Sequence, residues 1–241
     1  MSRHSGKTIW IIGASHGLGR ALAKTLDAQG ARLVISARSA NRLNELALEL
    51  NGATVIPMDV TDMMSVHRAM EVAGTVDHLV YNAGAYDPMH ALEWNTDQAL
   101  KMADVNFLGA MRMIGAVLPG FRAVGRGEIT LIGSLAGYRG LPRAVGYGAS
   151  KAALVSLAET LRSDLAGSGI TVRIVNPGFI KTRLTDKNSF AMPQIMEPEA
   201  AAAKVARAMC RRRFRTDFPW PFSLVIRTLA ILPDALVLRG K

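Results

Sequence analysis

The sequence predicts an α/β fold: a doubly wound parallel sheet of about seven strands, with helices on both faces. Two observations predict it. Short apolar runs alternate with amphipathic stretches at helical spacing, and Gly30, Gly52 and Gly167 follow such stretches where helices are expected to end. Strand–helix alternation requires parallel strands covered on both faces. We see no linker or repeat, so we expect a single domain, residues 1–241, in a chain that is 49% hydrophobic and 20% charged.

Six apolar runs are expected to form strands, and one further segment a last, edge strand. The runs are residues 8–12, 32–36, 54–58, 78–81, 128–132 and 171–175, and the edge strand is 213–218. Residues 18–29 and 42–50 are the expected helices between the first strands. Residues 197–212 form a later helix with Pro198 in its first turn, where its missing N–H is tolerated.

The alternation fades after residue 176. Residues 177–200 are rich in polar residues and prolines, which predicts a long loop, and long loops in compact domains often act as lids or binding segments. We assign a substrate lid to about 183–197. Its apolar residues suggest either an apolar pocket wall or ordinary anchors that hold the loop down; they are Leu184, Phe190, Met192, Ile195 and Met196.

The net charge of +10 is concentrated at one end of the chain. Residues 204–241 hold nine Lys or Arg against two Asp, which is +7 of that total, whereas a nucleic-acid groove should draw on many segments. We therefore expect no nucleic-acid partner, and we expect no metal site. The single Cys210 and an apolar run at 9–12 that is too short for a signal peptide predict a cytoplasmic protein.

The last part of the chain, about 211–241, is a basic and apolar C-terminal extension. Only eleven residues, with Arg227 among them, separate Pro221 from Pro233, so a transmembrane helix there is excluded on length. An apolar, arginine-flanked helix could lie on a membrane surface, form a subunit interface or cover an active site. Packing within the molecule or between subunits is the preferred interpretation, and we expect a homodimer or homotetramer.

The first expected strand runs into the glycine-rich stretch GASHGLG and then into a helix. Gly13, Gly17 and Gly19 allow a tight turn, let the backbone approach a pyrophosphate and let the helix pack closely on the strand. The free N–H groups at the start of that helix favour an anion. This context, a strand before the turn and a helix after it, predicts a nucleotide site.

The end of the second strand indicates which dinucleotide is bound. A carboxylate there would hold the 2′-hydroxyl of NAD, but this chain has Ala37 and Arg38. A guanidinium suits a 2′-phosphate, and His16 could add a donor to the same group. We therefore favour NADP(H), while a solvated loop arginine is the plainer alternative.

Tyr147 and Lys151 are four residues apart at an expected helix start, so they are neighbours on one helix face. An ammonium beside a phenol favours the phenolate and lowers the tyrosine's pKa, which would give a proton donor and acceptor poised nearer neutrality. Ser134 follows an apolar strand at the edge where ligands of parallel sheets bind, and Asn106 lies in an apolar helical stretch. Taken singly, the serine could be a cap and the asparagine a structural hydrogen-bond partner.

Together with Asn82-Ala83-Gly84 and Pro177-Gly178, these motifs resemble the short-chain dehydrogenase/reductase family, in its order and at its spacing over residues 8–182. The resemblance implies a Rossmann-like fold in the family's compact branch. The family usually has threonine before the first glycine, where this chain has Ile12; that change bears on the turn's stability more than on activity.

The resemblance also implies a role for each residue of the site. Tyr147 would exchange the proton of the substrate oxygen, and Lys151 would lower its pKa and bind the nicotinamide ribose. Ser134 would polarise the carbonyl, and Asn106 would hold a water in the proton relay. The residues expected at the cofactor are Gly13, Ser15, His16, Gly17, Leu18, Gly19, Arg38, Asp59, Val60, Asn82, Ala83, Gly84, Tyr147, Lys151, Pro177, Gly178, Ile180 and Thr182.

The expected function is therefore that of an NADP(H)-dependent oxidoreductase, with a small-molecule carbonyl or secondary alcohol as substrate. One alternative is a redox sensor that binds NADP(H) without turnover, but a sensor has no need of an acid–base pair. The other is a membrane-surface or nucleic-acid binder that uses the basic tail, which leaves the cofactor and catalytic motifs unexplained.

Overall fold

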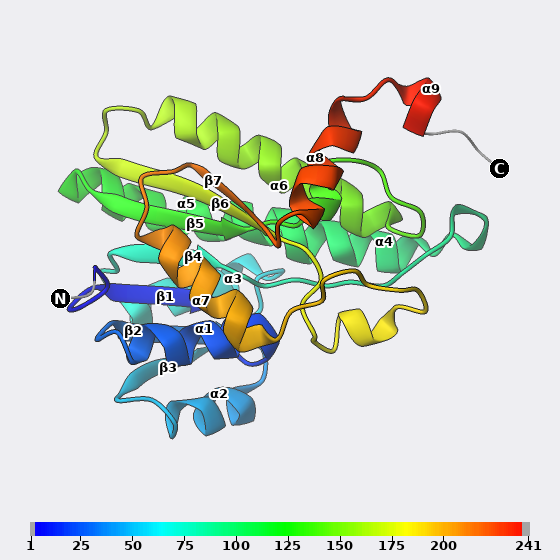
Figure 1. The fold of residues 1–241 in the computed structure, drawn as a ribbon. Coiled ribbons are helices and arrows are strands. Elements are labelled where there is room, and N and C mark those ends of the chain that lie inside the picture. Colours follow the sequence, from blue (N-terminus) through cyan, green and yellow to red (C-terminus); the bar gives the residue numbers. More distant parts are fainter. Residues whose placement is uncertain (1–2, 238–241) are drawn as a thin grey trace.

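The computed structural model describes residues 3–237, and its seven strands form one parallel sheet (Figure 1). The strands are β1 (Thr8–Ile12), β2 (Arg32–Ala37), β3 (Ala53–Pro57), β4 (His78–Tyr81), β5 (Gly127–Ile132), β6 (Ile170–Pro177) and β7 (Arg215–Phe218). Their order across the sheet is β3-β2-β1-β4-β5-β6-β7, and every neighbouring pair is parallel. The predicted fold class is confirmed.

Helices cover both faces of this sheet. One face carries α1 (Gly17–Asp27), α2 (Ala40–Ala47) and α7 (Pro198–Met209), and the other carries α3 (Met63–Ala73), α5 (Gly109–Val124) and α6 (Val145–Asp164). The two faces arise because successive strand residues point to opposite sides. In β1, Ile9 and Ile11 pack with the first group of helices, whereas Trp10 and Ile12 pack with the second.

A long helical run crosses the second face. The helix α4 (Thr96–Ala103) continues through one π turn (Asp104–Leu108) into α5, so the run Thr96–Val124 has 29 residues. Among the residues that the structure describes, this run alone is long and apolar enough to cross a membrane. Val117 and Phe121 on its inner side are buried in the apolar cluster against the sheet, as expected for the core helix of a globular fold.

The boundaries near the C-terminus differ from the sequence-based expectation. The helix predicted at 197–212 ends at Met209, and the edge strand predicted at 213–218 begins at Arg215. The chain leaves the helix where the carbonyl of Arg211 accepts a hydrogen bond from Nε of Arg173, 2.8 Å away on β6. This contact joins residues 38 positions apart, so local sequence could not indicate it.

The lid is irregular, as predicted, but both of its ends are fixed. It contains one short 3₁₀ turn, Thr185–Lys187, and no longer helix or strand. The N–H of Met196 donates to the carbonyl of Phe179 at 3.0 Å, and the N–H of Lys181 donates to the carbonyl of Met196 at 2.9 Å. These bonds close the loop against the end of β6.

The C-terminal extension begins as part of the sheet, since β7 is its last strand. Beyond it come α8 (Phe222–Ile231) and α9 (Asp234–Val237), drawn in red in Figure 1. The helix α8 contacts β7 and the 3₁₀ turn Leu135–Gly137, so part of the extension packs within the molecule, as preferred from sequence. The last four residues of the extension, 238–241, lie outside the described residues.

Candidate active site

A cavity of about 920 Å³ runs along the carboxyl edge of the sheet, where β1, β2, β4, β5 and β6 end. It brings together all but two of the predicted site residues. Those that line it are Gly13, Ser15, His16, Gly17, Leu18, Arg38, Asp59, Val60, Asn82, Ala83, Gly84, Ser134, Tyr147, Lys151, Pro177, Gly178, Ile180 and Thr182. Gly19 and Asn106 are not among the lining residues, and each has another role.

The glycine turn forms a cradle that side chains would fill. Gly13 has φ +87°, and a Cβ placed on it would lie 2.7 Å from the backbone N of Ala83. A Cβ on Gly17 would lie 2.7 Å from Cγ2 of Thr182 across the cleft. Gly19 lies beneath the cradle, because its Cβ would come within 2.0 Å of the carbonyl oxygen of Gly13. Gly19 therefore serves the close packing of helix on strand, and the open turn fits a pyrophosphate.

The charges of the cleft fit an anionic cofactor. Asp59 is the only acid among its described lining residues, against seven cations: Arg38, Arg42, Lys101, Lys151, Lys181, Arg183 and Lys187. Oδ1 of Asp59 is fixed by the backbone N–H of Thr61 at 2.9 Å and by its hydroxyl at 2.8 Å. Lys181 and Lys187 are paired with Glu197 and Asp87, and the five other cations still outnumber the one acid, which favours phosphate groups.

Arg42, in the first turn of α2, is a residue that the sequence reasoning missed. It contacts Nε2 of His16, and the ring's Nδ1 lies 2.9 Å from the Ser15 hydroxyl. Burial lowers the pKa of His16 to about 4, and the positive charges of Arg183, Arg42 and Arg20 contribute to the same shift. His16 is therefore neutral at neutral pH, and the positive charge at this end of the cleft comes from the arginines. The only sequence feature that could have indicated Arg42 was its position four residues after Arg38.

Three predicted catalytic residues meet at the ends of β5 and α6. Ser134 follows β5 and lies close enough to the Tyr147 phenol to lower its pKa, while its own Oγ accepts from the N–H of Ala136 at 3.1 Å. Lys151 lies one turn after Tyr147 on α6 and is 4% exposed. Its ammonium donates to the carbonyl of Ile132 at 2.8 Å and lies 5.7 Å from the centre of the Tyr147 ring.

The protonation of this group differs from the sequence-based expectation. Burial raises the pKa of Tyr147, the Ser134 side chain opposes that shift, and Tyr86 adds to it. Burial lowers the pKa of Lys151 to about 8. The expected lowering of the tyrosine pKa by the lysine is absent from this arrangement, because the ammonium is directed at the Ile132 carbonyl rather than at the phenol oxygen.

Asn106 is fully buried in the π turn between α4 and α5. Its Oδ1 accepts from the N–H of Ala85 at 2.7 Å, and its amide donates to the Ala85 carbonyl at 3.0 Å and to Oγ of Ser150 at 2.9 Å. Both amide hydrogens are thus used to join the loop after β4 to α6. The side chain positions the wall of the cleft, and its expected role in holding a water stays a prediction.

Aromatic residues form a second group that sequence reasoning did not find. The ring of Tyr86 meets that of Tyr147 edge-on, with centroids 4.9 Å apart, and its hydroxyl donates to Oδ1 of Asn188 in the lid at 2.7 Å. Phe179 stacks on Phe222 of α8 at 5.7 Å. Of these four rings only that of Tyr147 is among the described lining residues of the cavity, and the others connect its surroundings to the lid and to α8. The position of Tyr86, two residues after Asn82-Ala83-Gly84, was its one sequence signal.

A cradle for a pyrophosphate beside a serine–tyrosine–lysine group is the site of a nucleotide-dependent oxidoreductase. Residues 7–192 match the family described as short chain dehydrogenase, and the chain belongs to the short-chain dehydrogenase/reductase family. It is an NAD(P)-dependent oxidoreductase of that family, as its sequence resemblance implied.

Relatives agree with this assignment. An uncharacterized oxidoreductase of Myxococcus xanthus is 36% identical over 98% of this chain and 96% of its own. The crystal structure of a short chain dehydrogenase from Burkholderia cenocepacia in complex with NADP is 25% identical, with a TM-score of 0.88 over the whole of both chains. A 3-ketoacyl-(acyl-carrier-protein) reductase from Brucella melitensis, complexed with NADH, is 26% identical, with a TM-score of 0.83 over 91% of this chain and 99% of its own.

Proposed function

We propose that this protein transfers a hydride between NADP(H) and a carbonyl or secondary alcohol, with Tyr147 as the acid–base. The observation that carries the proposal is that the side chains of Ser134 and Tyr147 line the same cleft as the glycine turn, with Ser134 close enough to lower the pKa of the Tyr147 phenol. Two hydroxyl groups at that point can both donate to one substrate oxygen, which is what a carbonyl requires as negative charge develops on it.

The chain's own groups would share the work in the following way. Ser134 orients the carbonyl oxygen, and the Tyr147 hydroxyl donates its proton to that oxygen in reduction and takes it back in oxidation. Lys151 supplies a positive charge behind the tyrosine. The cofactor supplies the hydride when it is bound. The raised pKa of Tyr147 favours the protonated phenol, and therefore favours reduction, until a bound cofactor or substrate changes its surroundings.

The residues of the cleft would hold the cofactor along its length. The turn from Gly13 to Gly19 holds the pyrophosphate, and Asp59 meets the adenine. Asn82 braces the turn itself, since its amide donates to the Gly13 carbonyl at 2.9 Å. Pro177 and Thr182, which line the cleft, would contact the nicotinamide end.

The preference for NADP(H) over NAD(H) rests on the end of β2. Arg38 and Arg42 both line the cleft there, and residues 37–42 contain no carboxylate that would hold a 2′-hydroxyl. Two guanidinium groups suit the extra phosphate of NADP(H). The NADP-bound Burkholderia cenocepacia structure supports this choice, whereas the Brucella melitensis structure with NADH shows that a related fold also takes NADH.

The test is a panel of aldehydes, ketones and secondary alcohols with each cofactor, followed by the absorbance of the reduced nicotinamide. We expect turnover of apolar carbonyls with NADPH and a clear preference for it over NADH. Tight NADPH binding with no turnover on any substrate would indicate a redox sensor. Equal use of the two cofactors would contradict the role of the arginines.

A further inference from the structure

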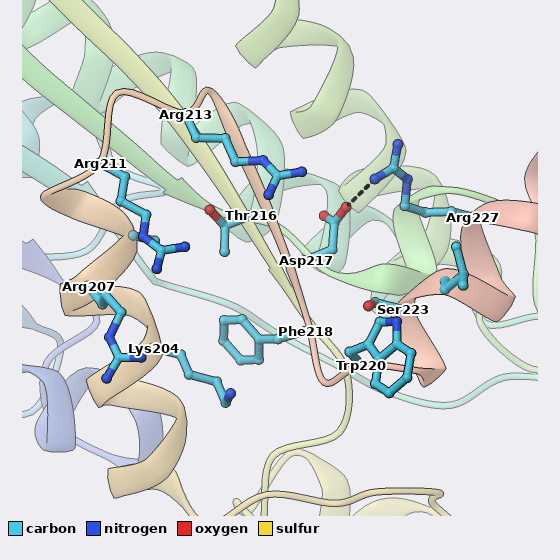
Figure 2. Close-up of a pocket in the computed structure, with 12 residues that line it drawn as sticks. Lys204, Arg207, Arg211, Arg213, Thr216, Asp217, Phe218, Trp220, Ser223 and Arg227 are labelled. Carbon is cyan, nitrogen blue, oxygen red and sulfur yellow. Dashed lines mark hydrogen bonds and ion pairs between the residues drawn. The ribbon is translucent and has the colours of Figure 1, made fainter.

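A second hollow, of about 350 Å³, lies between α7, β7 and α8, and we name it the basic groove (Figure 2). Its lining residues are Lys204, Arg207, Ala208, Arg211, Arg213, Thr216, Asp217, Phe218, Trp220, Ser223, Leu224 and Arg227. None of them lines the cofactor cleft, so the basic groove is separate from the site already described.

The positive charges of the basic groove are mostly unpaired. In Figure 2, Lys204 and Arg207 come from α7, and Arg211 and Arg213 from the loop before β7. All four side chains are exposed, and no carboxylate in the described part of the chain lies within 4.0 Å of their nitrogens. Four cations held this close repel one another, so the basic groove favours an anionic partner.

The one acid of the basic groove does not neutralise them. Asp217 accepts from the Tyr138 hydroxyl at 2.7 Å and from the amide of Asn176 at 2.9 Å. Its other oxygen lies 3.4 Å from Nη1 of Arg227, the dashed contact in Figure 2. Both oxygens of this carboxylate are therefore occupied by Tyr138, by Asn176 of β6 and by Arg227 of α8.

An apolar surface continues from the basic groove along α8. Only Ser223 and Ile226 of this helix are buried. Trp220, which lines the groove, is 77% exposed, Leu224 is 55% exposed and Ile231 is 82% exposed. A tryptophan and aliphatic side chains beside arginines are the composition of a helix that lies in a membrane interface, with its apolar groups in the acyl boundary and its cations at the lipid phosphates.

We propose that the basic groove and α8 dock this protein on an anionic membrane surface. A small anion or a nucleic acid would use the cations but leave Trp220, Leu224 and Ile231 in water. A second copy of the chain placed about a two-fold axis here would bring these cations against their own counterparts. A lipid surface would contact both the cations of the basic groove and the exposed apolar side chains of α8. The ten residues of α8 are enough to lie on a bilayer but too few to cross one.

The test is sedimentation of the full-length protein with two kinds of vesicle, phosphatidylcholine alone and phosphatidylcholine mixed with phosphatidylglycerol. We expect partitioning onto the anionic vesicles only, weakened by added salt. The double variant Arg207→Glu with Arg211→Glu should lose about thirtyfold or more in partition coefficient, at about 1 kcal/mol for each basic residue near the surface.

A matched variant separates this site from charge in general. Arg122→Glu with Arg126→Glu changes the net charge equally at two exposed arginines near the end of α5, and should bind vesicles as the unmodified protein does. Leu224→Gln should also reduce binding, while Leu100→Gln, at a leucine on α4 that is 62% exposed, should not.

Several results would overturn the proposal. The first is an equal loss of vesicle binding in the two double arginine variants. The second is equal binding of the unmodified protein to neutral and anionic vesicles, and the third is no binding to either kind of vesicle. A change of oligomeric state in Leu224→Gln, measured by light scattering, with vesicle binding unchanged would assign α8 to a second copy. Retention on duplex DNA without vesicle binding would assign the arginines to nucleic acid. The carbonyl assay with NADPH is expected to be unchanged in all four variants, which keeps this test independent of the proposed function.

Discussion

The two ends of the parallel sheet both hold charged and hydrogen-bonding groups in partly or fully buried positions, yet they differ in what surrounds them. At the amino end, Glu128 contacts Lys7 and Arg173, and His78 lies 3.9 Å from the same carboxylate. At the carboxyl end, Tyr147 and Lys151 border a cavity of about 920 Å³. The first group is closed around its own partners, and the second is open to a ligand.

Shifted pKa values therefore do not by themselves distinguish a working site from a structural one. Burial lowers the pKa of His78 to about 3. The pKa of Glu128 is lowered to about 2 even though burial alone would raise it, because His78, Lys7 and Arg173 outweigh that effect. Lys151, whose pKa is about 8, is shifted no more than these. What marks the carboxyl end as functional is its open cleft, since ion-pair networks also shift pKa values.

Removing the ammonium at the carboxyl end should give the largest effect of the variants that probe this comparison. In Lys151→Met we expect kcat/KM to fall by about a thousandfold, since both proton transfer and cofactor binding lose a positive charge. Stability should not fall by more than about 1 kcal/mol, because a buried ammonium is replaced by an apolar chain of similar length. Steady-state kinetics and urea unfolding measure the two effects. A large loss of stability with kcat/KM retained would show that Lys151 has a structural role and not a catalytic one.

The matching change at the amino end should act on stability instead. Glu128→Gln leaves Arg173 without a carboxylate partner, and we expect a loss of about 3 kcal/mol with kcat unchanged. Because the pKa of Glu128 in the folded protein, about 2, lies below its ordinary 4.5, its stabilisation is present above pH 4.5 and is lost as pH falls toward 2. Unfolding measured across that range should show a flatter pH dependence in the variant. An equally steep dependence would place the titrating group elsewhere.

The same contrast can be made within one strand. Arg38 follows β2 at the cleft, while Arg32 begins it and donates to the Thr8 hydroxyl at 3.3 Å. Arg38→Ala should weaken NADPH binding about tenfold with little effect on NADH, through loss of a charged hydrogen bond. Arg32→Ala should leave both unchanged. Fluorescence titration of each reduced cofactor measures this, and equal weakening of NADPH and NADH would count against a phosphate contact.

The smallest expected effect is on the pH dependence of binding. With a pKa of about 8 in the free protein, Lys151 loses its charge as pH rises through that value, well before an ordinary lysine would at 10.5. NADPH affinity should therefore fall several-fold between neutral and mildly alkaline pH. Titrations across this range, with Lys151→Arg as the variant that keeps its charge, give the comparison. An affinity that falls identically in both proteins would assign the effect to another group.

The sequence was informative wherever spacing along the chain fixes position in space. All seven strands were predicted, because apolar runs between helical stretches admit few other arrangements. Parallel strands end at a common edge, so the residues that follow them, such as Gly13, Asn82 and Ser134, could be placed in one cleft before the structure was known.

The features that the sequence did not indicate depend on contacts between distant segments. The amino-end cluster joins Lys7 to Glu128 across 121 positions, and no local pattern indicates that pairing. The predicted direction of the Tyr147 pKa shift was wrong. Burial raises this pKa, and the Lys151 ammonium donates to the Ile132 carbonyl although helical spacing places it beside the phenol. The sequence indicated a basic C-terminal segment, but only the structure shows that cations from α7, a loop and α8 line one groove.

The central claim is that chemistry takes place at Tyr147, and Tyr147→Phe tests it most directly. The variant keeps the ring against Tyr86 and leaves Lys151 in place, but it has no hydroxyl. NADPH binding, followed by fluorescence, and turnover, followed by absorbance, are measured on the same preparation. We predict that NADPH binding is retained while turnover falls by about three orders of magnitude. Full turnover in Tyr147→Phe would contradict the proposed mechanism.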